Sequence, residues 1–221
     1  MDEFNIEELD ERNRTIQREF LLALKDQGAV LKRVSVPLVK YMLPLYYSLI
    51  PSEAATNLSR YDGIKYGHQP DFLPNEDLME YVERVRSETF GPNVKRRVVL
   101  GNFLLSSKFE SFNEKVRRAQ KIRRLLITQW CTMMECNDID IVVSPTTIGE
   151  EPPLIRDLQT AKPDPVKEFK MDYFTAFPNT LGIPSVTLPV HQDSYKMPSS
   201  VKLHSYFGED YHLLRAAKQI E

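Results

Sequence analysis

Apolar residues recur along this chain with two different periods, and each period predicts a different kind of element. Across residues 2–27 and 109–136 they return every three or four positions, which is the spacing of one face of an α-helix. The run at 109–136 is the longest, so it predicts the longest helix. Shorter stretches predict helices at 52–61, 76–88, 93–105 and 209–220, and a helix or turn at 171–181.

Short runs of β-branched and apolar residues predict four strands, at 30–36, 139–144, 186–190 and 200–206. Residues 139–144 are almost continuously apolar, which is typical of a strand buried on both faces, and 186–190 are expected to be buried as well. Residues 200–206 alternate instead. Because helices and strands share the chain in this way, the sequence predicts an α/β fold in which a mixed sheet is flanked by helices.

Glycine, proline and small polar residues indicate where these elements end. Gly28 is placed to stop the first helix, and Gly63 to stop the helix that Ser52 caps, because glycine readily takes the left-handed conformation. Residues 37–47 are predicted to form a proline-punctuated connector. The proline-rich stretch 147–170 is predicted to be a long loop that covers a site or a partner.

The composition fits one soluble domain. The 221 residues are enough to bury a core, and the hydrophobic fraction of 42% and charged fraction of 27% are ordinary. The formal net charge of −2 argues against a protein that binds nucleic acid or a membrane through its overall charge. The apolar stretch 36–50 is interrupted by Pro37, Lys40 and Pro44, so it does not predict a membrane-spanning helix.

The two cysteines, Cys131 and Cys136, lie in the predicted helix 109–136. Their spacing does not favour a disulfide, so both are predicted to be free thiols in a reducing compartment. Two thiols alone do not make a zinc site, and the histidines are scattered without the spacing of metal ligands. The sequence therefore predicts no metal site.

The least generic stretch is residues 53–63, which read Glu-Ala-Ala-Thr-Asn-Leu-Ser-Arg-Tyr-Asp-Gly. Further blocks accompany it: Tyr-Tyr at 46–47, Val-Lys-Arg-Arg-Val-Val-Leu-Gly-Asn-Phe at 94–103, Ala-Gln-Lys-Ile-Arg-Arg-Leu at 119–125, Asp-Ile-Val-Val-Ser-Pro-Thr-Thr at 140–147 and Asn-Thr-Leu-Gly-Ile-Pro-Ser-Val-Thr-Leu-Pro at 179–189. In this order and spacing, over most of the chain, the blocks resemble those of the amidase-signature family.

Members of this family use a serine nucleophile that is activated through a second serine and a lysine. Those groups lie in a Gly/Ser-rich segment in the N-terminal half of a full-length member, and residues 1–221 contain no such segment. The resemblance therefore implies that the chain corresponds to the C-terminal half of an amidase-signature domain. It also implies that the chain carries no catalytic residue of its own.

Within the family, the blocks are similar to those of glutamine-dependent amidotransferase A subunits, especially the mitochondrial kind. The resemblance implies a role in converting Glu-tRNA(Gln) to Gln-tRNA(Gln) in mitochondrial translation. In such an enzyme the A subunit releases ammonia from glutamine, the tRNA-borne glutamate is activated with ATP and Mg on the B subunit, and the two are braced by a small C subunit. No cofactor is then expected on this chain, and the mitochondrial matrix is its expected location.

Two alternatives stay open. The chain is either a non-catalytic fragment that docks on partner subunits, or part of a different amidase of the same superfamily that acts on small amides. A pocket that recognises both charges of a free amino acid would argue against the second alternative, because a polar site left unpaired rejects the wrong ligand strongly.

The resemblance also implies which residues bind glutamine. An arginine in the block 94–103 is expected to hold the α-carboxylate, since a guanidinium can donate two parallel hydrogen bonds to a carboxylate. We favour Arg97, with Arg96 as the second choice. Without the resemblance, both would be interpreted as solvated charges on a helix.

Asp172 is expected to bind the α-ammonium of glutamine, although alone it would be interpreted as a helix cap. A tyrosine of the adjacent pair, Tyr47 rather than Tyr46, is expected to line the same pocket. A tyrosine can pack against a ligand and donate one hydrogen bond to it. The alternative for the tyrosine pair is simple packing on the core.

Other charged residues are predicted to serve the structure. Arg60 and Asp62 are expected to form a buried pair that fixes the chain where the helix ends. The basic run 117–124 is predicted to be a solvated helix face, and contact with tRNA or with another protein chain is the alternative.

Overall fold

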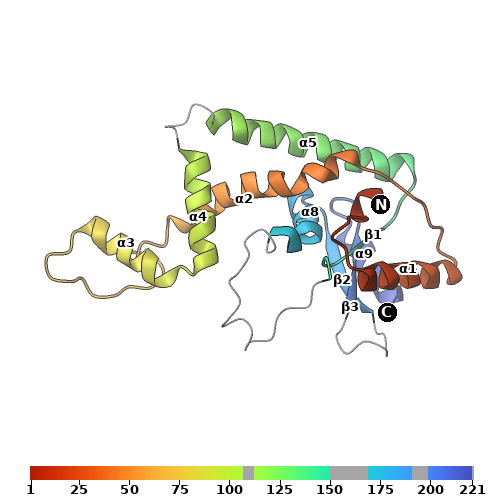
Figure 1. Ribbon diagram of the computed structural model, residues 1–221, viewed down its shortest axis with the longest axis horizontal. Helices are drawn as coiled ribbons and strands as arrows, with labels where there is room; N and C mark the ends of the chain where they lie inside the picture. The colour runs from red at the N-terminus through yellow and green to blue at the C-terminus, as the bar shows by residue number, and fades with distance from the viewer. Residues whose placement is uncertain (107–111, 150–168, 191–198, 221) are drawn as a thin grey trace. The chain divides into compact units, whose positions relative to one another are not determined.

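The computed structural model describes residues 1–106, 112–149, 169–190 and 199–220. The chain divides into two compact units, which we call unit 1 (Met1–Leu43 with Arg123–Glu221) and unit 2 (Pro44–Ile122). Helices and one small sheet make up the described part of the chain (Figure 1), which confirms the predicted α/β fold.

Unit 1 holds the sheet and the helices that pack on it. Its elements are the 3-10 helices η1 (Asp2–Phe4) and η2 (Pro37–Tyr41), the helices α1 (Glu11–Asp26), α8 (Tyr173–Leu181) and α9 (Asp210–Ile220), and the strands β1 (Val142–Pro145), β2 (Ser185–Val190) and β3 (Ser199–His204). Unit 2 is helical, with α2 (Met42–Leu58), α3 (Leu78–Thr89) and α4 (Pro92–Leu105). The helix α5 (Phe112–Cys136) begins in unit 2 and ends in unit 1.

The described strands lie in the order β1-β3-β2, and both neighbouring pairs are antiparallel. The central strand is thus the last one in sequence, and its residues 201–204 are buried. The sequence predicted alternation for this strand and burial for β2, but β2 alternates between exposed and half-buried residues. The two strands have each other's predicted burial because β2 lies at an edge of the described sheet and β3 lies in its centre. Local sequence does not encode the position of a strand in a sheet.

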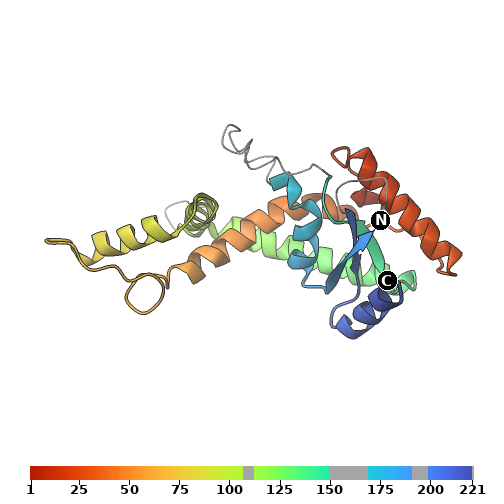
Figure 2. The same cartoon turned by 90° about the horizontal axis from the view of Figure 1, so that it is seen from below.

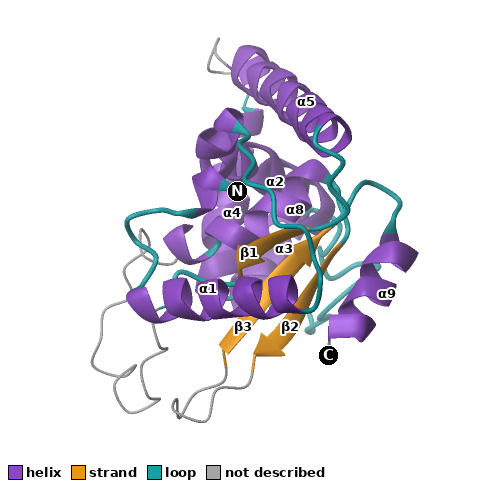
Figure 3. Ribbon diagram, turned by 90° about the vertical axis from the view of Figure 1, so that its right-hand side faces the viewer, coloured by secondary structure: helices purple, strands orange, loops and turns teal. Residues whose placement is uncertain are grey.

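One face of the sheet is covered by α1 and α9 (Figure 3). Leu203 of β3 packs with Leu213 and Ala217 of α9, and Phe20 of α1 joins this apolar cluster. The amphipathic spacing of both helices explains the arrangement, because each buries one apolar stripe on the sheet. In Figure 2 the sheet lies between α8 and α9.

Aromatic rings cover the opposite face. Phe4 and Phe177 meet edge to face with ring centroids 5.2 Å apart, and Phe177 meets Trp130 of α5 in the same way at 5.2 Å. The ring of His204 lies 5.4 Å from that of Phe177. Such edge-to-face contacts add to the free energy gained by burying the rings.

The strand predicted at 30–36 is wrong. Val30 is 81% exposed and Leu31 is 44% exposed, and only Val34 and Val36 are buried. The Val34 carbonyl accepts a hydrogen bond from the backbone N–H of Asp2 at 3.0 Å, not from a neighbouring strand. The apolar residues therefore anchor an extended loop.

The connector predicted at 37–47 and the cap predicted at Ser52 are also wrong. Helix α2 begins at Met42 and continues past Ser52, whose hydroxyl donates to the Ser48 carbonyl at 3.1 Å. Pro44 is tolerated in the first turn because the N–H groups there have no helical acceptor. Pro51 lies inside the helix and removes one backbone hydrogen bond from it.

Two helices are capped by an aspartate that the sequence analysis did not predict as a cap. The Asp10 carboxylate accepts from the Asn13 N–H at 2.7 Å, so α1 begins at Glu11 rather than at residue 2. Asp77 and Glu80 form a capping box at the start of α3. In a capping box each side chain satisfies a backbone N–H of the other residue, which fixes the helix start.

The segment between α2 and α3 is tied to α3 by side chains. Arg84 donates to both carboxylate oxygens of Glu76, at 2.7 and 2.8 Å, and to the Asp71 carbonyl at 2.9 Å. These hydrogen bonds lower the pKa of Glu76 to about 2. The Tyr81 hydroxyl donates to the Gly63 carbonyl at 3.2 Å, and Gly63 has the predicted left-handed conformation, with φ of 78°.

The other helices are confirmed close to their predicted bounds, as is the stop at Gly28. The first residues of the helix predicted at 109–136 and most of the loop predicted at 147–170 lie outside the described residues. Cys131 and Cys136 are free thiols, as predicted. No helix in the described ranges is both long enough and apolar enough to cross a membrane.

Within unit 2, α2 and α4 approach each other closely at Gly101. A Cβ added there would lie 2.0 Å from the Pro51 carbonyl oxygen and 2.7 Å from the Ala55 Cβ. Both distances are far below van der Waals contact, so only glycine fits. The helical glycine is therefore retained in spite of its low helix propensity.

We predict that Gly101→Ala separates α2 from α4 and lowers the free energy of unfolding by about 1–3 kcal/mol, the usual cost of overpacking. Urea unfolding followed by circular dichroism measures this change. Gly91→Ala is the matched control, because a Cβ there meets nothing within 4 Å. Equal stability of the two variants would show that the helices do not need this close approach.

His204 titrates as a buried group. Burial lowers its pKa to about 3, and the positive charge of Lys202 acts in the same direction. The ring is therefore neutral in the folded protein, whereas in the unfolded chain it takes up a proton below its usual pKa of 6.5. The unfolded state then binds more protons than the folded state between pH 6.5 and about 3, so stability falls as the pH falls through this window.

We predict that His204 contributes up to about 1.4 kcal/mol of lost stability per pH unit below pH 6.5. His204→Gln should flatten the slope of unfolding free energy against pH, measured by urea unfolding between pH 7 and pH 4. The unmodified chain is the reference. If His204→Gln has the same slope as the unmodified chain, His204 is not buried in its neutral form.

Candidate functional site

The five residues predicted to bind a ligand come from three elements. Tyr46 and Tyr47 lie in α2, Arg96 and Arg97 lie in α4, and Asp172 immediately precedes α8. The first four belong to unit 2 and Asp172 belongs to unit 1. The convergence of Arg97 and Asp172 on one pocket stays a prediction.

Tyr46 and Tyr47 are consecutive residues of a helix, so their side chains point about 100° apart. Both are half-buried, and their rings meet edge to face with centroids 5.2 Å apart. Each ring therefore restricts the other, and a ligand that contacts one tyrosine meets a ring already held in place.

Arg96 and Arg97 differ in exposure. Arg96 is half-buried, whereas Arg97 is exposed on the surface of unit 2, as is the preceding Lys95. The Lys95 ammonium donates to the Ser87 carbonyl at 2.7 Å, which ties the start of α4 to α3. The Arg97 side chain is therefore the more exposed of the two, and the choice of Arg97 over Arg96 stays a prediction.

Asp172 occupies the position of a helix cap but does not cap with its side chain. Its backbone carbonyl accepts from the N–H of Thr175 at 3.1 Å and from that of Ala176 at 2.7 Å, and its carboxylate makes no capping hydrogen bond. The residue is half-buried. The start of α8 is therefore stabilised by the Asp172 backbone, and the predicted contact of its carboxylate with an ammonium group stays a prediction.

The predicted buried pair of Arg60 and Asp62 is wrong. Arg60 is exposed, and the Asp62 carboxylate accepts from the backbone N–H of Ile64 at 2.9 Å. This contact within the turn lowers the pKa of Asp62, with smaller effects from other groups. A local turn therefore shapes the end of the block 53–63, because an aspartate can bond its own backbone two residues on.

The basic run on α5 is mostly solvated, as predicted. Arg117, Arg118, Lys121 and Arg124 are exposed. Arg123 differs, because it is half-buried and its Nε donates to the Thr180 carbonyl at 2.7 Å. This hydrogen bond joins α5 to the end of α8 within unit 1.

Sequence reasoning missed a buried polar pair on the sheet. Ser144 of β1 and His204 of β3 are both fully buried, and Ser144 Oγ lies 2.8 Å from His204 Nε2. The two strands are adjacent but their residues are far apart in sequence, so only the strand register brings them together. The one signal was a histidine at the end of a stretch that was predicted to form a strand.

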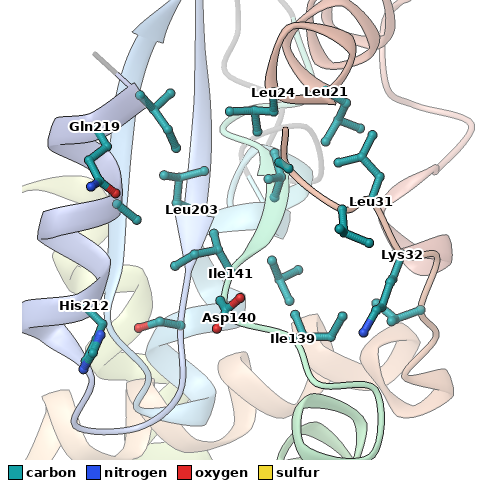
Figure 4. A pocket seen from close by; sticks show the side chains of 18 of the residues that line it. Leu21, Leu24, Leu31, Lys32, Ile139, Asp140, Ile141, Leu203, His212 and Gln219 are labelled. Atoms are coloured by element: carbon teal, nitrogen blue, oxygen red, sulfur yellow. The ribbon is translucent and has the colours of Figure 1, made fainter. Parts of the chain in front are cut away.

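An open groove of about 1180 Å³ also went unpredicted (Figure 4). It lies in unit 1 between α1 and α9, and Leu21, Leu24, Leu31, Ile141 and Leu203 give it an apolar floor, with polar residues such as Gln219 beside them. Within the described ranges, no three metal-binding side chains are grouped so as to hold a metal ion.

Comparison with known proteins gives matches along nearly the whole chain. A family model described as Amidase matches residues 1–214. The A subunit of glutamyl-tRNA(Gln) amidotransferase from Jannaschia sp. (strain CCS1) is 32% identical over 219 residues, which is 99% of this chain and 43% of the relative. The protein of the same name from Neisseria meningitidis is 37% identical over 199 residues, covering 90% of this chain and 39% of the relative.

Solved structures match the fold. The A subunit of glutamyl-tRNA(Gln) amidotransferase from Thermotoga maritima aligns with a TM-score of 0.68 at 24% identity, covering 99% of this chain and 40% of that one. A 6-aminohexanoate cyclic dimer hydrolase aligns with a TM-score of 0.65 at 18% identity, covering 96% of this chain and 41% of that one. The chain thus spans less than half the length of the relatives that it matches.

Proposed function

Because this chain belongs to the amidase family, we propose that it acts as part of the A subunit of a glutamyl-tRNA(Gln) amidotransferase. The observation that carries the proposal is the match to relatives of that name, one of which is 32% identical over 99% of the chain. In this reaction ammonia released from glutamine converts Glu-tRNA(Gln) to Gln-tRNA(Gln).

The chain would supply the wall of the glutamine pocket rather than the nucleophile. The Ser-Ser-Lys groups of the family would come from sequence that this chain does not contain, in line with the coverage of only 43% of a relative. The partners that this reaction requires are the B subunit, with ATP and Mg, together with the C subunit. We also propose a mitochondrial location, although the relatives named above are bacterial.

The proposed pocket recognises glutamine through both of its charges. Arg97 would donate paired hydrogen bonds to the α-carboxylate, and its exposed position leaves it accessible for them. Asp172 would accept from the α-ammonium with a carboxylate that does not cap α8. Tyr47 would line the side of the pocket, held by the ring of Tyr46. Arg96 is the second choice for the carboxylate.

A different small-amide amidase is the second candidate function. It is favoured by the fold match to a 6-aminohexanoate cyclic dimer hydrolase, a protein outside the tRNA-dependent group, over 96% of the chain. Such an enzyme needs no site for the two charges of a free amino acid. Substrate preference therefore separates the two candidates. A non-catalytic docking role is the third and requires neither substrate.

We predict that the purified chain releases only background ammonia from glutamine. The family's serine nucleophile and the donors that stabilise its oxyanion would both lie outside residues 1–221. A coupled glutamate dehydrogenase assay measures the ammonia, with the chain boiled beforehand as the control. Turnover that follows the folded chain through a second purification step would contradict the proposal.

In the complete amidotransferase assembled with this sequence, we predict that Arg97→Ala lowers glutamine-dependent activity through weaker glutamine binding. The lost charge-assisted contact is worth about 1.5–3 kcal/mol, which is roughly a tenfold to more than a hundredfold loss of affinity. Asp172→Asn should weaken glutamine binding through the ammonium end. Steady-state transamidation over a range of glutamine concentrations measures both effects.

Ammonia-dependent transamidation is the internal control, because free ammonia bypasses the glutamine pocket. It should survive both substitutions. Arg117→Ala, at an exposed arginine of α5, should change neither activity. If glutamine-dependent and ammonia-dependent rates fall together in the Arg97 and Asp172 variants, these residues support the fold or an interface instead of the pocket.

A further inference from the structure

The face of the sheet that packs against aromatic rings also carries polar side chains. Lys202 of β3 lies directly opposite Ser144 of β1 and Thr187 of β2 in the two antiparallel pairs. Directly opposed residues of antiparallel strands point to the same face. An ammonium group and two hydroxyl groups are thus placed in one row across three strands, with His204 two residues further along β3.

Lys202 is only 8% exposed. In the described part of the chain no carboxylate lies within ion-pair distance of its ammonium group, and no hydrogen bond from it is found. A buried charge without a partner destabilises the folded protein, because the surroundings do not replace the water that it loses. Burial accordingly lowers the pKa of Lys202.

The neighbouring groups supply no negative charge. The Ser144 hydroxyl donates its proton to the Pro145 carbonyl at 2.9 Å. The hydroxyl oxygen must therefore be the acceptor in its 2.8 Å contact with His204, and the ring Nε2–H is the donor. His204 Nδ1 is then an acceptor, and it is buried with no hydrogen-bond partner among the described residues. Among the described residues of the three strands, this face therefore holds the Lys202 cation and a neutral histidine.

The β2 side of this face is open. Ser185 and Thr187 of β2 are both exposed. In the register of β2 and β3, Ser185 lies opposite His204 and Thr187 lies opposite Lys202. A group arriving from solvent on this side would meet Thr187 first, and Lys202 is the residue directly opposite Thr187 on β3. Hydroxyl groups and an ammonium donate hydrogen bonds, so the arrangement favours an acceptor with a negative charge.

We propose that this face of the sheet is a binding site for a carboxylate, held by the Lys202 ammonium and the Thr187 hydroxyl. A single negative charge matches the single cation, whereas a phosphate with nearly two charges would leave one of them uncompensated. The carboxylate comes either from a small molecule or from an acidic side chain of a polypeptide packed on the face. The site shares no residue with the proposed glutamine pocket, so the two stand or fall separately.

The test is a titration of the purified chain, with the Lys202 side chain observed by NMR through its ¹³Cε and ¹Hε signals. Sodium acetate, glutamine and N-acetyl-aspartic acid amide are added, each against sodium chloride at the same ionic strength. We expect a saturable shift with at least one carboxylate, at least tenfold tighter than any effect of chloride, together with a higher melting temperature. Acetate or glutamine as the better ligand indicates a small molecule, and the aspartyl compound indicates an acidic side chain.

Lys202→Met should abolish the gain in melting temperature, and Thr187→Val should weaken binding several-fold. Thr187 is exposed, so the second variant tests the site even if the first alters folding. Lys218→Met, at an exposed lysine of α9, should bind as the unmodified chain does. A response to chloride equal to that of every carboxylate, or an equal loss in the Lys218 variant, would overturn the proposal.

Discussion

The burial of β3 on both faces is the constraint on which the rest of unit 1 depends. Leu203 and His204 are consecutive residues of this strand, and both are fully buried although they point in opposite directions. Leu203 is covered because α1 and α9 bring their apolar stripes to one face. His204 is covered because Phe4 and Phe177 close the other. Residues 201–204 of this strand are shielded from water, so their polar side chains depend on partners within the fold. Ser144 supplies one for His204, whereas Lys202 has none among the described residues.

Much of the fold could be predicted wherever the signal is local. Helix α5 was predicted because its apolar positions keep one period over its 25 residues, and α4 was predicted from the same kind of spacing over a shorter stretch. The strand predicted at 30–36 failed because Val34 and Val36 are buried by elements distant in sequence. Helix α2 was predicted too short because its two prolines look like breaks, whereas one falls in the first turn and the other costs a hydrogen bond that the helix can spare.

The site was predictable only in part, for a related reason. Arg97, Asp172 and the tyrosine pair come from the resemblance, and nothing in their local pattern separates them from solvated or packed residues. The cap expected of Asp172 is made by its backbone and not by its carboxylate. The pairing of Ser144 with His204, and the row that Lys202 forms with Thr187, depend on strand register. Register is a property of two segments together, so one sequence read residue by residue does not contain it.

The segment between α2 and α3 is held in place largely by the side chain of Arg84. It holds Glu76 and the Asp71 backbone, while Tyr81 from the same helix holds the backbone at Gly63. Fixing a flexible segment costs conformational entropy. Here a few hydrogen bonds from α3 to the segment between α2 and α3 offset that loss. Loss of the Arg84 guanidinium would break the contacts with Glu76 and with the Asp71 backbone together, while the contact of Tyr81 with Gly63 would remain. The part of the segment next to α3 would then open locally, at a lower free energy than global unfolding, and a protease would reach it there.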